Sequence, residues 1–234
     1  MNATILAGLD PFDLFDTEAA RLDAYFSGLT GPDWDHPSRC EGWSVRDVLG
    51  HLAGEELYNH ACLDDDLDGL FARLEKEGVQ DLGGFNEWCV RQRRALPVED
   101  VLAEWRRENG DTRRRMRELG GNATLTTMAG PYAVPLQTLH YSSEYATHAD
   151  DIGVPVEHGE EPDRTAWRAR VGIFVLDEQD SPVRVEEIAG GYRVELDEEV
   201  AELSAADFVD ATTGRLGAGH TLGSELRSAL VCLA

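Results

Sequence analysis

The strongest constraint on the fold is a series of long segments in which apolar residues recur every three or four positions. This spacing gathers the apolar side chains on one face of a helix, and such a face must be buried. Glycine and proline residues end each segment, so the pattern predicts separate helices. Four principal helices are expected, at residues 12–29, 45–63, 99–119 and 136–152. An antiparallel four-helix bundle is the natural way to bury their apolar faces.

Local signals support these boundaries. Ser44 stands where an N-cap belongs and Asp47 follows three residues later, which resembles a capping box at the start of the second helix. Three further segments are expected: a helical stretch at 85–96 that Pro97 ends, a weaker helical piece around Phe71 and Leu74 at the surface, and an irregular or extended connection at 124–135.

The composition changes after residue 157. A polar, proline-containing stretch at 157–163 is typical of a linker, and alternating residues around Gly190 and Gly191 predict a β-hairpin. Ser204 is placed to cap a short helix at 205–213. The sequence therefore predicts an α+β protein, with a helical bundle at 1–157 and a small C-terminal α+β domain at 163–234.

Charge limits the partners. The chain has 45 acidic and 21 basic residues and a formal net charge of −24, which disfavours nucleic acid and anionic membrane surfaces. No apolar run approaches the roughly 20 residues of a membrane helix, so we expect a cytoplasmic protein. The four cysteines are widely spaced and form no CxxC pair, which predicts buried or incidental thiols. They are Cys40, Cys62, Cys89 and Cys232.

One group of residues forms a candidate metal site. Glu144 and His148 are four residues apart on the last bundle helix, so both side chains leave the same face. A third ligand would come from a facing helix, where His51 is the candidate. Two histidines and a glutamate suit zinc with one open position for a water or a thiol. From spacing alone, a simple hydrogen-bonded pair is the commoner explanation for Glu144 and His148, and a core histidine for His51.

Two stretches of the sequence resemble the mycothiol-dependent maleylpyruvate isomerase family, whose N-terminal part is a DinB-like metal-binding bundle. They are SRCEGWSVRDVLGHL at 38–52 and SEYATHADDIG at 143–153. The resemblance implies an up-down-down-up bundle that binds zinc through His51, Glu144 and His148. It also implies a smaller C-terminal α/β domain with a catalytic arginine near a helix end. Arg215, which closes the stretch SAADFVDATTGR at 204–215, is the candidate, and a solvated arginine is the alternative.

The resemblance further implies an enzyme in which zinc, or another divalent metal, activates mycothiol or a similar low-molecular-weight thiol. The thiolate would attack a small-molecule electrophile. The outcome would be either cis-trans isomerisation of a maleylpyruvate-like diacid or thiol S-transfer, in which the adduct is the product. None of the chain's cysteines is needed as the nucleophile. A metal-dependent hydrolase with the same ligands and a non-catalytic metal- or ligand-binding bundle remain alternatives. We expect a monomer or a homodimer.

Three other features have alternative interpretations, and a fourth has one. His140 lies on the face of His148 and is expected either to line the metal cavity or serve as a proton shuttle, or else to lie at the boundary of the site. Asp151 either orients a ring N–H of His148 or lies at the surface. Trp43 is expected to anchor packing before the second helix. The three arginines at 113–115 are expected to pair with neighbouring acids, the alternative being attraction of an anionic substrate.

Overall fold

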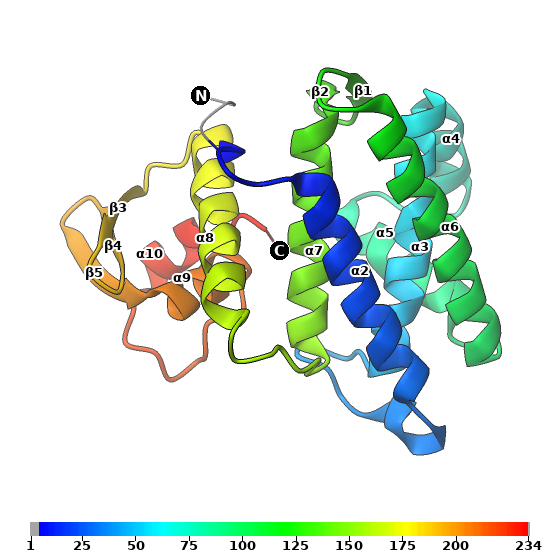
Figure 1. The fold of residues 1–234 in the computed structure, drawn as a ribbon, viewed down its shortest axis with the longest axis horizontal. Coiled ribbons are helices and arrows are strands. Elements are labelled where there is room, and N and C mark those ends of the chain that lie inside the picture. Colours follow the sequence, from blue (N-terminus) through cyan, green and yellow to red (C-terminus); the bar gives the residue numbers. More distant parts are fainter. Residues whose placement is uncertain (1–4, 234) are drawn as a thin grey trace. The chain divides into compact units, whose positions relative to one another are not determined.

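Four long helices make up the first of two units into which the chain divides (Figure 1). The computed structural model describes residues 5–233, and this unit spans Asp10–Val154. The bundle helices are α2 (Pro11–Gly28), α3 (Val45–Asp64), α6 (Val98–Leu119) and α7 (Val134–Asp151). The shorter elements are η1 (Gly31–Asp35), α4 (Leu67–Lys76), α5 (Leu82–Arg93), β1 (Thr124–Thr127) and β2 (Gly130–Ala133).

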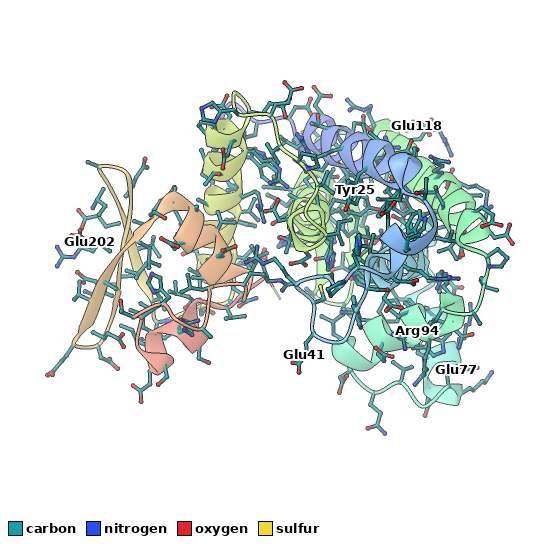
Figure 2. All side chains as sticks on the ribbon, turned by 90° about the horizontal axis from the view of Figure 1, so that it is seen from below. Tyr25, Glu41, Glu77, Arg94, Glu118 and Glu202 are labelled. Carbon is teal, nitrogen blue, oxygen red and sulfur yellow. The ribbon has the colours of Figure 1, made fainter. Side chains whose placement is uncertain are left out.

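Contacts between side chains give the directions of the helices. Tyr25, which Figure 2 labels, is late in α2, and its hydroxyl donates to the carbonyl of Ile152 just after α7. Ser142 in α7 donates to Pro11 at the start of α2, so these two helices are parallel. Pairs between α3 and α6 also advance together: His60 with Glu108, then Asp64 with Arg115.

Helices α2 and α6 run in opposite directions, because Asp23 pairs with Arg106 whereas Asp13 pairs with Arg117. The bundle is therefore up-down-down-up. The segment that contains α4 and α5 returns the chain to the end of the bundle where α3 began, which allows α6 to run parallel to α3.

Capping and close packing fix α3. The expected capping box is present: the Ser44 hydroxyl accepts from the backbone N–H of Asp47, and the Asp47 carboxylate accepts from the backbone N–H of Ser44. A Cβ atom at Gly54 would overlap the side chains of Cys89 and Arg93, so this glycine is what lets α5 lie close against α3.

One expectation about the bundle needs correction. The piece around Phe71 and Leu74 is helix α4, but it is not purely a surface element, because three of its leucines are buried in the main core: Leu67, Leu70 and Leu74. The connection at 124–135 is extended, which was one of the two expectations, and its strands form an antiparallel hairpin, β1–β2. The arginines at 113–115 pair with acids as expected.

The second unit combines residues 5–9 with 155–233. The N-terminal segment belongs here because the Arg170 guanidinium donates to the carbonyl oxygens of Ile5 and Ala7. The elements are α8 (Glu161–Glu178), β3 (Arg184–Ile188), β4 (Gly191–Leu196), β5 (Glu199–Ser204), α9 (Ala205–Thr212) and α10 (Ser224–Leu230). Its strands form an antiparallel sheet in the order β3-β4-β5, and buried residues of the strands and helices share one core.

This unit confirms the expected hairpin and the helix capped by Ser204, and with them the α+β class. The expected linker at 157–163 is wrong in its second half, because residues 161–163 already belong to α8. The apolar residues of α8 are mixed with arginines and acids, and this conceals its helical period. Within the described residues, no helix has both the length and the hydrophobicity to cross a lipid bilayer.

A buried polar network joins α3, α6 and α7. Glu56 is 1% exposed, and each of its carboxylate oxygens accepts two hydrogen bonds. The donors are Tyr145 at 2.9 Å, Asn109 at 3.1 Å, Asn59 at 3.0 Å and Thr112 at 2.5 Å. Burial, with the nearby Glu56, raises the pKa of Tyr145 well above its ordinary value, so its hydroxyl remains a donor. Because every donor has its acceptor, the carboxylate is tolerated in the core.

We predict that Glu56→Gln lowers the free energy of unfolding by about 2 kcal/mol, since an amide NH2 would face two donors in place of an acceptor. Denaturant unfolding followed by circular dichroism measures the change. Glu75→Gln, at an exposed position on α4, removes the same charge and should leave stability unchanged. Equal stability of the two variants would contradict the structural role assigned to Glu56.

Candidate functional site

The candidate site lies in the seam between α3 and α7, which run antiparallel to one another. His51 is in the middle of α3 and is 2% exposed; His148 is near the end of α7 and is 5% exposed. Their rings approach edge to face, with centroids 4.8 Å apart. Glu144 lies one turn before His148 on the same face of α7. The structure therefore brings together the three residues that the sequence proposed as metal ligands.

One carboxylate oxygen is the centre of this arrangement. Oε1 of Glu144 lies 3.1 Å from Nε2 of His51 and 3.1 Å from Nε2 of His148. Although the two histidines are buried, 35% of the Glu144 side chain is exposed, so this carboxylate also faces accessible space. The site thus has a buried side made by two imidazoles and an open side at the glutamate.

The donor set fits a divalent metal ion. One potential ligand atom from each of the three residues lies within 4.8 Å of the other two. Zinc bonds of about 2.0–2.1 Å in a tetrahedral site separate ligand atoms by about 3.4 Å, close to the spacing found here. Two imidazole nitrogens and one carboxylate oxygen leave the fourth position of such an ion for an exogenous ligand.

Electrostatics couples the three side chains. Burial would raise the pKa of Glu144, but hydrogen bonds from His148 and His51 outweigh it and hold that pKa well below its ordinary value. Burial would lower the pKa of His148, but hydrogen bonds to Asp151, Cys40 and Glu144 raise it well above its ordinary value. The metal-free site therefore contains an ionised carboxylate beside a protonated imidazole, and a cation would take the place of that proton.

The other face of His148 is held by Asp151. Nδ1 of His148 lies 3.1 Å from Oδ2 of Asp151, whose side chain is fully buried. This contact favours the interpretation that Asp151 orients the ring and contradicts a surface position. Because Asp151 holds the proton on Nδ1, the proton that leaves when a cation binds is the one on Nε2, and the lone pair of Nε2 then faces the metal. This is how a buried carboxylate orients a metal-binding histidine.

Cys40 was expected to be a buried or incidental thiol, and the structure places it beside His148. Its Sγ donates to the same Asp151 oxygen at 3.1 Å and lies 3.8 Å from Nδ1 of His148. The thiol is not part of a disulfide and is partly exposed. Cys40, His148 and Asp151 also form a second group of possible metal ligands.

Other candidates take positions around the site or away from it. The Trp43 ring lies 5.2 Å from that of His51, and its Nε1 donates to Glu87, so it packs where an anchor was expected. His140 contacts the hydroxyl of Tyr132 at 3.0 Å. Arg215 belongs to the second unit, just after α9, and its guanidinium donates to the carbonyl of Thr213 at 2.6 Å.

Sequence reasoning missed Glu55. Its Oε2 lies 3.7 Å from Nε2 of His51, and its side chain is 14% exposed. The signal was available, because His51 and Glu55 have the same four-residue spacing as Glu144 and His148.

Comparisons with known proteins identify the family. The model of the mycothiol maleylpyruvate isomerase N-terminal domain matches residues 15–153, more than half of the chain and all of the candidate metal site. The chain belongs to this family, and the resemblance drawn from the sequence is confirmed.

Solved structures agree on the fold. A crystal structure of the mycothiol-dependent maleylpyruvate isomerase superposes with a TM-score of 0.63 at 15% identity, covering 92% of each chain. A histidine-to-alanine mutant of that enzyme gives a TM-score of 0.62 at 14% identity, covering 88% of each chain. The similarity extends over both units, so the whole chain has that fold. No curated protein sequence matches the chain.

We predict that Asp151→Asn weakens zinc binding about 10- to 100-fold, because the ring of His148 loses the carboxylate that holds its Nδ1 proton. Competition with a chromophoric chelator measures the affinity. Asp150→Asn changes the same charge in the same helical turn and serves as the control. An Asp151→Asn protein with wild-type affinity would show that this contact does not tune the ligand.

Zinc affinity should fall as the pH falls. The raised pKa of His148 means that a cation must displace its proton even near neutral pH, so the affinity decreases about tenfold for each pH unit over which one proton is released. Titration calorimetry in two buffers of different ionisation enthalpy, between about pH 6 and 8, counts the released protons. An affinity independent of pH in this range would contradict the protonation state derived for His148.

Proposed function

We propose that the chain is an enzyme that uses a divalent metal ion, zinc in the first instance, and mycothiol to attack an electrophilic small molecule. The reaction is cis-trans isomerisation of a maleylpyruvate-like diacid or thiol S-transfer, in which the adduct of mycothiol with another electrophile is the product. The observation that carries the proposal is the convergence of His51 Nε2 and His148 Nε2 on one oxygen of Glu144, inside the segment matched by the family model.

The residues of the bundle suit this chemistry. A bound divalent cation supplies the positive charge that lowers the pKa of a coordinated thiol, so that thiolate is available near neutral pH. His51 and His148 are buried and exclude water from one side of the site, whereas Glu144 leaves the other side accessible. Asp151 keeps the Nδ1 proton of His148 away from the metal-facing nitrogen. The chain's own cysteines are not required, because the small-molecule thiol is the nucleophile.

Arg215 is proposed as the group that stabilises negative charge on the substrate. Addition of a thiolate to a double bond conjugated with a carbonyl moves charge onto the carbonyl oxygen, and the permanent charge of a guanidinium can stabilise that enolate or a substrate carboxylate. Departure of the thiolate after rotation about the former double bond gives the trans isomer. Support for this role comes from the resemblance of residues 204–215 to the corresponding region of the family.

The proposal is tested by metal content and thiol-dependent turnover of the same preparations. Wild-type protein should contain about one zinc per chain and isomerise maleylpyruvate only when mycothiol is present, whereas His148→Ala should lose both properties. Turnover that needs metal but no thiol would replace the proposal with a metal-dependent hydrolase. Metal without turnover on any thiol and electrophile pair would favour a binding protein.

For Arg215→Ala we expect a decrease in kcat of about 10²- to 10³-fold with metal content unchanged, as for loss of one charge-stabilising donor. Steady-state kinetics beside zinc analysis separates the two effects. Arg184→Ala, at an exposed position on β3 in the second unit, is the matched control. Normal turnover by Arg215→Ala would remove this residue from the mechanism.

A further inference from the structure

The seam between α3 and α7 contains a symmetry that the three-ligand description leaves out. Each helix carries one histidine and one glutamate four residues apart, in opposite order: His51 then Glu55 on α3, and Glu144 then His148 on α7. Because the helices are antiparallel, the two histidines face each other at one level and the two glutamates at the next. The contact between the two histidine rings agrees with this arrangement of the histidines.

Glu55 lies close to Nε2 of His51, the nitrogen proposed to bind the metal ion. Its Oε2 is 3.7 Å from Nε2 of His51, the same nitrogen that contacts Oε1 of Glu144. Only 14% of its side chain is exposed. This carboxylate therefore lies close to His51 and is mostly shielded from solvent. Among the described residues it belongs to neither group whose ligand atoms all lie within 4.8 Å of one another, so its side chain would have to turn towards a cation in order to bind it.

The surroundings of Glu55 differ from those of the next residue. Glu56 has four hydrogen-bond donors around it. Glu55 is mostly buried and lies near the carboxylates of Glu144 and Glu56 and the imidazole of His148. A divalent cation held by His51, Glu144 and His148 would place a positive charge beside this carboxylate.

We propose that Glu55 is a fourth protein ligand of the metal ion, so that the complete donor set is two imidazole nitrogens and two carboxylate oxygens. This inference rests on the metal site of the proposed function and extends it. Such a set leaves a position for the thiol only on an ion that accepts more than four ligands, as zinc does when it becomes five-coordinate and as iron(II), manganese and nickel do. The four residues come as two helical pairs, which resembles the metal sites built inside other helical bundles.

The test replaces the Glu55 carboxylate with a thiolate, whose bond to a metal ion can be detected by absorption spectroscopy. In Glu55→Cys loaded with cobalt(II), a thiolate bonded to the metal gives a sulfur-to-cobalt charge-transfer band in the near ultraviolet, and the wild-type protein gives the baseline. Glu55→Gln should bind zinc at least about tenfold more weakly in chelator competition. Glu75→Gln removes a charge from the exposed surface of α4 and should bind like wild type.

A new sulfur band in Glu55→Cys together with weaker zinc binding by Glu55→Gln supports the inference. Glu55→Gln with wild-type affinity, or cobalt-loaded Glu55→Cys without the band, overturns it and leaves the three-ligand site intact. A sulfur band already present in wild type would assign the cation to Cys40, His148 and Asp151 and also overturns it. Wild-type protein that binds no cation overturns the proposed metal site itself, which separates the failure of the two proposals.

Discussion

The approach of two imidazole nitrogens to a single oxygen of Glu144 determines much of the architecture around it. His51 lies 93 positions before Glu144 and 97 positions before His148 in the sequence. The three side chains therefore come together only through the packing of α3 against α7. That packing depends on elements outside the site: the capping box at Ser44 sets where α3 begins, and Gly54 admits α5 against it. Burial of these polar groups is tolerated because each has a charged or hydrogen-bonding partner nearby.

Glu55 and Glu56 are adjacent on α3 but lie in different surroundings, and they have different roles for that reason. Glu56 is surrounded by donors from α3, α6 and α7 and closes a network that ties the bundle together. Glu55 points in a direction about 100° away round the helix, and its Oε2 lies 3.7 Å from Nε2 of His51. The same residue type thus closes a hydrogen-bond network at one position and lies beside the candidate metal ligands at the next.

The family assignment limits the chemistry without fixing the substrate. The bundle carries the candidate ligands, and the second unit carries Arg215 on the loop after α9, so the proposed metal and the proposed charge-stabilising group come from different parts of the chain. One bundle can serve several thiol reactions, and the residues that select the electrophile need not be those that bind the cation.

The sequence alone determined the four bundle helices, the capping box and the pairing of Glu144 with His148, because these depend on spacing within a single helix. It also indicated His51, through its resemblance to a known family. Tertiary structure decided the rest: that Cys40, from a loop without periodicity, meets Asp151; that the leucines of α4 are buried; and that residues 161–178 form a helix whose mixed composition conceals its period. It also decided the position of Glu55, whose spacing from His51 was visible but whose meaning depends on α7 running antiparallel beside it. Local spacing fixes which side chains share a face, whereas only packing fixes what that face meets.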